Sequence, residues 1–417
     1  MTLEYVENLG RKAKAASARM AALTTELKDR CLLAMAAALR KNSGVLLEKN
    51  ALDVTAAQAK GATEAFIDRL TLTEKRVEEM ARGLEDLAAL KDPIGQILSG
   101  WKGAQDIEIT KVRVPLGVVG IIYEARPNVT ADAAGICFKT GNAVILRGSG
   151  EALESNKATV ALLRQAIREA GGPEDGVLLM EDVSREAAAE LMRLNQYLSV
   201  LIPRGGAGLI RSVVKEATVP VIETGVGNCH IYVDQSADLA MALNILVNAK
   251  TQRTGVCNAA ESLLVHQAVA RDFLTLAGPV LKDKGVELRA CRRSLAYLPQ
   301  ALAATEEDYY QEFLDLILSV KIVDSLEEAV DHINKYGTGH SEAIITRDYE
   351  ASRKFTSEVD AAAVYVNAST RFTDGGQFGL GAEIGISTQK LHARGPMGLE
   401  EMTTIKYIVY GQGQVRA

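Results

Sequence analysis

One cysteine lies in a stretch of sequence that suits nucleophilic chemistry. Cys257 belongs to the segment Gln252-Arg-Thr-Gly-Val-Cys-Asn258, which follows a predicted helix over 239–250 and precedes a predicted strand over 262–266. A thiol in such a loop can reach a substrate, and the nearby cation of Arg253 would favour the thiolate that attacks carbonyl carbon. The alternative is a buried structural thiol, which is the more usual environment of a cysteine. The local sequence leaves both interpretations open.

Common nucleotide and metal motifs are missing from the sequence. Gly225-Val-Gly-Asn-Cys-His230 lacks the third glycine of the dinucleotide fingerprint GxGxxG, and Gly379-Leu-Gly-Ala-Glu-Ile384 has isoleucine in that place. There is neither a GxxxxGK[ST] phosphate loop nor a GxSxG nucleophile elbow. The five histidines form no HExxH or HxH pair, so we expect no metal site.

The composition is that of a globular protein with more than one domain. A chain of 417 residues is too long for one ordinary core, and its 47% apolar and 24% charged residues are typical values. The net charge of −6 is small for this length, which argues against a nucleic-acid partner. Five scattered cysteines without a CxxC pair indicate a reducing compartment. With no apolar signal segment and no membrane-spanning apolar run, we expect a cytoplasmic protein without membrane contact.

Hydrophobic periodicity separates a helical region from an α/β region. Residues 1 to about 95 carry apolar residues three and four apart, which predicts several packed helices. From about residue 112, short apolar runs alternate with helical stretches, the pattern of a parallel α/β sheet. The first series has strands over 118–123, 143–147, 198–202 and 219–223, with helices over 155–170 and 184–194. The second series has strands over 231–234, 262–266, 317–323, 343–346 and 363–367.

These two series predict a fold with two α/β domains and a small additional element. The first domain takes residues 1–99 and 113–227, and the second takes residues 228–396. Residues 100–112 alternate polar and apolar side chains like a β-hairpin arm, and the tail 397–417 holds a predicted strand over 403–410. Exposed strand edges tend to be covered by a partner. We therefore expect the arm and the tail to mediate homo-oligomerisation.

Several segments gain meaning from their order along the chain. These segments are 141–150, 312–315, Tyr123–Asn128, Ile222–Asp234, Gln252–Asn258 and Val323–Ile344. Their order and spacing resemble those of the aldehyde dehydrogenase superfamily over nearly the whole chain. The four segments given with residue names are also similar to the γ-glutamyl phosphate reductase branch of that superfamily. The resemblance implies an aldehyde-dehydrogenase-like fold, in which the first domain binds the cofactor and the second is catalytic. It also implies that Cys257 is the nucleophile.

The implied reaction assigns roles to two catalytic residues. Reduction of an acyl phosphate needs a nucleophile, an oxyanion site and a hydride donor. By resemblance, Cys257 displaces phosphate to form a thioester. The side chain of Asn128 and the backbone N–H of Cys257 would hold the oxyanion. From the residues alone, Asn128 is better explained as a turn residue after Pro127.

The resemblance implies NADPH as the cofactor, held without a glycine fingerprint. Arg147 matches a residue that contacts the adenosine ribose in relatives, and a guanidinium there suits a 2′-phosphate. Arg204, Gly205 and Gly206 open a predicted helix whose N–H groups can face the pyrophosphate. Glu312 matches the residue that binds the nicotinamide ribose. Without the resemblance, these would be a solvated arginine, a plain strand-to-helix turn and an exposed carboxylate at a helix end.

One element departs from the oxidising aldehyde dehydrogenases. Those enzymes carry Glu-Leu-Gly-Gly, whose carboxylate activates the water that hydrolyses the thioester, whereas this chain reads Glu223-Thr224-Gly225-Val-Gly-Asn. A reductase would lose its thioester to such a water. We therefore interpret Glu223, Thr224 and Gly225 as part of the cofactor pocket and not as a general base.

The implied substrate is L-glutamyl 5-phosphate, which carries an α-amino group, an α-carboxylate and a phosphate. The product would be L-glutamate 5-semialdehyde, in the second step of proline biosynthesis from glutamate, and glutamate 5-kinase is a conceivable transient partner. Neither His332 nor His340 receives a chemical role. The candidates for substrate binding are Arg126, Arg253 and the loop 367–374, in particular its residues Ser369, Thr370 and Arg371.

Two other functions remain open. One is an oxidising or CoA-acylating aldehyde dehydrogenase of the same fold, which the altered element after Glu223 disfavours. The other is a non-catalytic regulatory or scaffold subunit. The presence of Cys257, Asn128 and Glu312 together counts against it.

Overall fold

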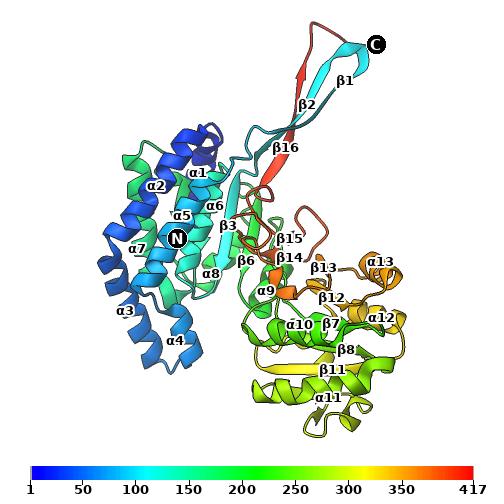
Figure 1. Ribbon diagram of the computed structural model, residues 1–417. Helices are drawn as coiled ribbons and strands as arrows, with labels where there is room; N and C mark the ends of the chain where they lie inside the picture. The colour runs from blue at the N-terminus through cyan, green and yellow to red at the C-terminus, as the bar shows by residue number, and fades with distance from the viewer. Residues whose placement is uncertain (1, 417) are drawn as a thin grey trace. The chain divides into compact units, whose positions relative to one another are not determined.

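The computed structural model describes residues 2–416, and the chain divides into two compact units (Figure 1). The first unit runs to Glu223 and includes Gly379–Gly385 and the chain from Met397, and the second takes Thr224–Phe378 and Ile386–Pro396. The predicted boundary lay a few residues later, at 227, and placed residues 379–385 in the second domain. These residues join the first unit because Ile384 and Gly385 exchange backbone hydrogen bonds with Met397, at 2.9 and 2.8 Å.

The helical region predicted for the amino-terminal part is confirmed. Three of its helices begin at a threonine whose hydroxyl accepts the N–H three residues on, because a helix start leaves its first donors without partners in the helix. These threonines are Thr24, Thr63 and Thr73. The helices are α1 (Thr2–Ala21), α2 (Thr25–Lys41), α3 (Ser43–Ala59), α4 (Glu64–Leu70) and α5 (Glu74–Ala89).

A four-stranded parallel sheet forms the rest of the first core, in the order β5-β4-β3-β6. Its strands are β3 (Val118–Tyr123), β4 (Ala143–Arg147), β5 (Val177–Leu179) and β6 (Val200–Arg204), and its helices are α6 (Asn128–Lys139), α7 (Leu153–Glu169), α8 (Arg185–Met192) and α9 (Ala207–Glu216). The strand predicted over 219–223 is wrong. Only one isolated bridge joins Val221 to Leu201, beside Pro220, which has no N–H to donate.

The predicted hairpin and the predicted terminal strand belong to one antiparallel sheet (Figure 1). Strands β1 (Ile97–Lys102) and β2 (Glu108–Pro115) form the hairpin, and β16 (Thr403–Tyr410) pairs with β2 along its whole length. Two segments about three hundred residues apart in the chain thus make a single arm of the first unit.

The second unit contains a seven-stranded sheet in the order β10-β9-β11-β8-β7-β12-β13. All its pairings are parallel, as the continuous apolar strands predicted. The strands are β7 (Cys229–Val233), β8 (Ala260–His266), β9 (Glu287–Ala290), β10 (Leu302–Ala303), β11 (Ile317–Val323), β12 (Ser341–Ile345) and β13 (Ala363–Val366). A short pair, β14 (Ile386–Ser387) and β15 (Gly395–Pro396), lies apart from this sheet.

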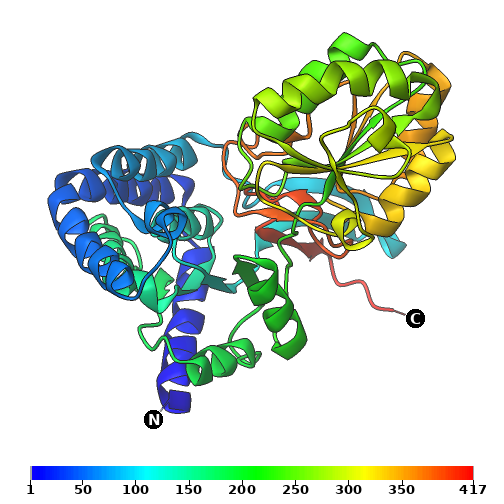
Figure 2. The same ribbon diagram turned by 90° about the horizontal axis from the view of Figure 1, so that it is seen from below.

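Helices cover both faces of this sheet (Figure 2). On one face, α10 (Leu239–Thr251) and α11 (Gln267–Asp283) pack on side chains such as Ile231 and Leu263. On the other, α12 (Leu326–Tyr336) and α13 (Tyr349–Glu358) pack on Tyr232 and Leu264. The predicted α/β class with two α/β units is therefore confirmed. Among residues 2–416, no helix is both long and apolar enough to cross a membrane.

Candidate active site

Cys257 lies at the amino edge of the second sheet. The loop 252–259 joins α10 to β8, and the Cys257 residue in it is half-buried. On one side of β8, β7 begins at Cys229, and next to β7 in turn β12 begins at Ser341. Because these strands are parallel, their first residues share one edge of the sheet. The loop position predicted for the thiol is confirmed, and the site is built where the strands begin.

The segment 224–228, which leads into β7, packs directly on the Cys257 loop. A Cβ placed on Gly227 would lie 1.4 Å from the carbonyl oxygen of Cys257, so a side chain has no room here. The Cys229 thiol donates to the same carbonyl oxygen at 3.2 Å. The N–H of Gly227 donates to Oε1 of Glu312 at 2.6 Å. The structure thus brings Cys257, Gly227 and Glu312 together.

Glu312 differs from the exposed helix-end carboxylate that its local sequence suggested. It lies in an irregular segment before β11, and its side chain is half-buried. Burial raises the pKa of Glu312, and the hydrogen bond from Gly227 acts in the opposite direction. A carboxylate fixed in this way is suited to accept hydrogen bonds from the hydroxyl groups of a ligand.

The loop predicted to hold the substrate is tied to the Cys257 loop. The hydroxyl of Thr370 donates to the carbonyl of Asn258 at 2.7 Å, and the amide of Asn258 donates to the carbonyl of Thr373 at 2.9 Å. Ser369 accepts the N–H of Arg371. Both Ser369 and Thr370 are buried. Their contacts therefore favour a role in holding the loop, whereas Arg371 remains partly exposed.

A cavity of about 230 Å³ lies beside this loop. Nε of Arg371 donates to Gln252 at 2.8 Å. Burial and the neighbouring charge of Arg253 both lower the pKa of Arg371, whereas the charges of Asp374 and Cys257 act to raise it. The structure therefore brings Arg253, Arg371 and Cys257 into one electrostatic environment. The cavity is lined by Asn248, Gln252, Arg371, Phe372, Asp374 and Gln377.

Two of these lining residues, Asn248 and Gln377, lie outside the segments that the sequence singled out for the site. Asn248 precedes Gln252 by one helical turn, so the two share a face at the end of α10. That spacing next to the cysteine loop was a signal that the sequence contained.

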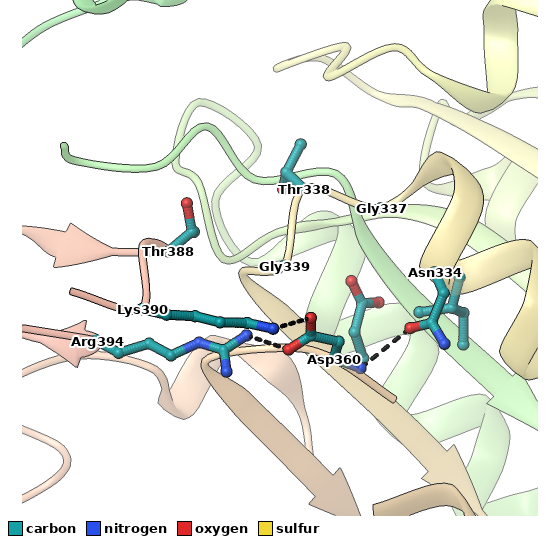
Figure 3. Close-up of a pocket in the computed structure, with 10 residues that line it drawn as sticks. Asn334, Gly337, Thr338, Gly339, Asp360, Thr388, Lys390 and Arg394 are labelled. Carbon is teal, nitrogen blue, oxygen red and sulfur yellow. Dashed lines mark hydrogen bonds and ion pairs between the residues drawn. The ribbon is translucent and has the colours of Figure 1, made fainter. Parts of the chain in front are cut away.

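A larger cavity of about 460 Å³ is lined by residues that include Gly337, Thr338, Asp360 and Thr388 (Figure 3). The carboxylate of Asp360 forms ion pairs with Lys390 at 2.6 Å and with Arg394 at 2.7 Å, and both side chains extend toward it in Figure 3. This ion pair cluster holds 386–396 on the second unit. There the N–H of Gly225 donates to the carbonyl of Ile386 at 2.8 Å. The 386–396 segment thus supports the 224–228 loop.

Three histidines of the second unit, His230, His332 and His340, are buried. Burial lowers the pKa of His332 to about 2 and that of His340 to about 4, so both are neutral near pH 7. The His332 ring lies 5.1 Å from Tyr309 and 5.6 Å from His230, centroid to centroid. His230 in turn pairs with the buried Glu342 at 3.0 Å.

In the first unit, Asn128 is the first residue of α6 and is exposed, as Arg126 is. Its amide donates to Oδ2 of Asp132 at 3.2 Å. Burial raises the pKa of Asp132 to about 6. Asn128 and Cys257 belong to different units, so their pairing stays a prediction.

Arg147 ends β4 with part of its guanidinium unused. Nη2 donates to the carbonyl of Val183 at 2.8 Å, whereas the buried Nε has no hydrogen-bond partner among the described residues. Burial lowers the pKa of Arg147, and the charges of Glu151 and Asp182 oppose that shift. An unused donor on a partly buried cation fits an anionic ligand.

The turn at Arg204, Gly205 and Gly206 connects β6 to α9, as predicted. Glu124, which the sequence did not single out, lies against it. Its carboxylate accepts the N–H of Gly206 at 3.0 Å, and a Cβ on Gly205 would lie 2.6 Å from its carboxyl carbon. One of the N–H donors at the start of α9 is therefore already bonded to an acidic side chain.

The remaining predicted pocket residues lie where the two units join along the chain. Glu223 is half-buried and ends a segment of the first unit, and Thr224 is buried and begins the second. Among the described residues, no group of three or more His, Cys, Asp or Glu side chains could hold a metal ion.

Comparisons with known proteins identify the family. Residues 1–283 and 309–408 match the aldehyde dehydrogenase family. The gamma-glutamyl phosphate reductase of Heliobacterium modesticaldum is 63% identical over 407 residues, covering 98% of each chain. That of Carboxydothermus hydrogenoformans is 60% identical over 414 residues, covering 99% of this chain and 100% of its own. The chain belongs to the γ-glutamyl phosphate reductases.

The fold of this γ-glutamyl phosphate reductase family member agrees with a solved structure. The crystal structure of gamma-glutamyl phosphate reductase from Thermotoga maritima matches with a TM-score of 0.97 at 49% identity, covering 99% of this chain and 100% of that one. The resemblance drawn from the sequence motifs is confirmed, and so is the expectation of an oxidoreductase of the aldehyde dehydrogenase family.

Proposed function

We propose that the chain reduces L-glutamyl 5-phosphate with NADPH to L-glutamate 5-semialdehyde, releasing phosphate, in the second step of proline biosynthesis. The membership of the γ-glutamyl phosphate reductase family supports the substrate. The packing of Gly227 against the Cys257 carbonyl, with Glu312 bonded to the same glycine, is the observation that carries the chemistry. It joins a half-buried thiol and a ribose-binding carboxylate through one residue.

The covalent chemistry is assigned to Cys257. Its thiolate attacks the C5 carbonyl of the acyl phosphate, forming a C–S bond. The tetrahedral oxyanion accepts hydrogen bonds from the Cys257 backbone N–H and the Asn128 side chain. Collapse of this intermediate breaks the C–O bond to phosphate and leaves a thioester. After reduction of the acyl group, Cys257 leaves as the thiolate.

The residues present fit a nicotinamide dinucleotide. When bound, NADPH supplies the hydride for the thioester. Glu312 would accept hydrogen bonds from the nicotinamide ribose hydroxyls. Arg147 suits the 2′-phosphate, because its buried Nε has no hydrogen-bond partner within residues 2–416. Thr224, Gly225 and the half-buried Glu223 would border the ring, the glycine leaving room beside it.

The turn 204–206 is assigned to the pyrophosphate, together with Glu124. Arg204, Gly205 and Gly206 place a cation and helix-start N–H groups at one end of α9. Because Glu124 already accepts the N–H of Gly206, a phosphate group there would have to displace that carboxylate.

The cavity beside Arg371 is assigned to the amino-acid end of the substrate. Arg371 suits the α-carboxylate, since its planar guanidinium matches carboxylate geometry. Asp374 in the same cavity suits the α-ammonium group. Arg253 and Arg126 are assigned to the phosphate, and Ser369 and Thr370 to the loop that carries Arg371.

A homo-oligomer formed through the arm of the first unit is part of the proposal. Ile405, Tyr407 and Val409 alternate along β16 and are 40, 54 and 54% exposed, so they lie on one face of the strand. Trp101 of β1 meets Tyr407 edge-on with 6.2 Å between ring centroids. A second copy of the chain would cover this apolar stripe. We also propose a cytoplasmic location. Transient contact with glutamate 5-kinase would suit L-glutamyl 5-phosphate, because this substrate is unstable.

The reverse reaction tests the function. Wild type is expected to reduce NADP⁺ with the semialdehyde only when phosphate is present, and Cys257→Ala is expected to lose this activity. Asn128→Ala should lose roughly 10²–10³-fold in rate. Cys291→Ala, which removes another half-buried thiol of the second unit, is the matched control and should stay active. Activity in Cys257→Ala, or phosphate-independent oxidation of simple aldehydes, would overturn the proposal.

A further inference from the structure

A buried ion pair closes the base of the loop that carries Cys257. Lys250 lies in the last turn of α10 and Glu261 near the start of β8, so the pair flanks residues 252–259. Nζ of Lys250 lies 2.5 Å from Oε2 of Glu261, and both side chains are 0% exposed. Two buried charges are tolerated only where each remains against its partner. The two ends of the loop are therefore held together.

The second oxygen of the same carboxylate holds another part of the site. Oε1 of Glu261 accepts the N–H of Leu314 at 3.2 Å. Leu314 has a φ of +56°, a left-handed conformation that costs a non-glycine residue free energy, and its side chain is 47% exposed. Packing of an exposed side chain does not explain this conformation. The hydrogen bond to Glu261 fixes the backbone N–H of this residue.

Leu314 follows Glu312 by two residues, so the contacts form a closed chain around the nucleophile. Glu312 accepts the N–H of Gly227, and Gly227 lies against the Cys257 carbonyl. One carboxylate oxygen of Glu261 pairs with Lys250, at the base of the Cys257 loop. The other oxygen accepts the N–H of Leu314, in the segment 312–314. Two of the contacts that support the Cys257 loop thus depend on one buried carboxylate.

We propose that Lys250 and Glu261 are positioning residues that hold the Cys257 loop and the Glu312 segment in place relative to each other. This assignment rests on the proposed function, in which Cys257 carries the acyl group and Glu312 binds the cofactor. Neither residue of the pair touches the reacting atoms. Buried ion pairs can often be replaced by apolar residues without loss of stability, so a role in stability alone would make the pair dispensable for catalysis.

Two double variants separate the contributions of the two oxygens. K250M/E261M removes the charges and also the acceptor for the Leu314 N–H. K250M/E261Q removes the charges but keeps a carbonyl acceptor at the same position. The matched control is K28M/D92N, which removes the buried pair Lys28–Asp92 of the first unit.

The readouts are kcat and the KM for NADP⁺ in the reverse reaction, with amide hydrogen exchange and thermal unfolding. K250M/E261M is expected to lose roughly 10- to 100-fold in kcat and to raise KM for NADP⁺. Its amides should exchange faster over 252–259 and 311–316 together. K250M/E261Q should exchange faster over 252–259 only and keep a near wild-type KM. The control should change thermal unfolding without changing KM.

Two results would overturn the assignment. One is a K250M/E261M variant with wild-type kcat, KM and exchange, and the other is an equal rise in KM in both double variants. If K250M/E261M does not fold, hydrogen exchange of K250M/E261Q over 252–259 decides, and unchanged exchange there refutes the role. Absence of NADP⁺-dependent activity in wild type would refute the proposed function, whereas the exchange pattern would still test the pair.

Discussion

The Cα of Gly227 lies so close to the carbonyl of Cys257 that a Cβ on this glycine would be 1.4 Å from the oxygen. The obstructing atom is backbone, and it cannot rotate away as a side chain would. The same glycine donates its N–H to Glu312. Gly227 is thus the point at which the loop of the nucleophile and the segment of the proposed cofactor ligand meet.

Gly227→Ala should therefore damage the site more than any nearby glycine substitution. We expect a loss of roughly 10²-fold or more in kcat for the reverse reaction, because the Cys257 loop must shift to admit the methyl group. Gly255→Ala is the control, since nothing lies within 4 Å of a Cβ there. A wild-type rate for Gly227→Ala would show that the two loops are not packed as described.

Arg371→Met should weaken binding of the semialdehyde. Loss of a charge-assisted hydrogen bond to the α-carboxylate is expected to raise KM for this substrate by about tenfold or more, with KM for NADP⁺ unchanged. Arg371→Lys should have a KM for the semialdehyde between those of wild type and Arg371→Met, because a lysine keeps the charge without the planar fork. Arg347→Met, which removes an exposed arginine of the second unit, serves as the control. Equal effects of both methionine variants would argue against the assignment.

His340 should make stability depend on pH in a defined direction. Burial lowers its pKa in the folded chain to about 4, whereas the unfolded value is near 6.5. Between these pH values the imidazole binds a proton in the unfolded chain but not in the folded chain. The contribution of His340 to the free energy of unfolding therefore falls as pH falls through this range, by about 1.4 kcal/mol per pH unit. Urea unfolding from pH 7 to pH 5 measures the slope. His340→Gln should reduce it, and an unchanged slope would contradict the shift.

Ile405→Asp should separate the subunits of the proposed oligomer. A carboxylate in the apolar stripe of β16 would have to be buried at the interface without a partner, which is unfavourable. Light scattering is expected to give a lower mass for this variant than for wild type. Lys406→Asp introduces the same group on the opposite face of the strand and should leave the mass unchanged. A native oligomer in Ile405→Asp would exclude this face.

Much of the fold could be predicted because local patterns determine local elements. The apolar run 118–123 became a buried strand, and the stretch before Cys257 became α10. The hairpin and the terminal strand were also recognisable, but their pairing was not, because nothing in either segment encodes a partner about three hundred residues away. The short strand β5 escaped prediction for a related reason, since three residues carry too little periodicity.

For the candidate site, too, local features could be predicted from the sequence and long-range contacts could not. The sequence by itself determined which residues could act: a cysteine in a loop, a carboxylate before a strand, and arginines at strand and loop ends. Only the tertiary structure decided which of them share a site, because hydrogen bonds such as that from Gly227 to Glu312, and from Leu314 to Glu261, join distant segments. It also showed that Thr370 is buried and bonded, and that Glu124 lies at the start of α9. Residue type specifies the available chemistry, whereas long-range packing specifies its geometry.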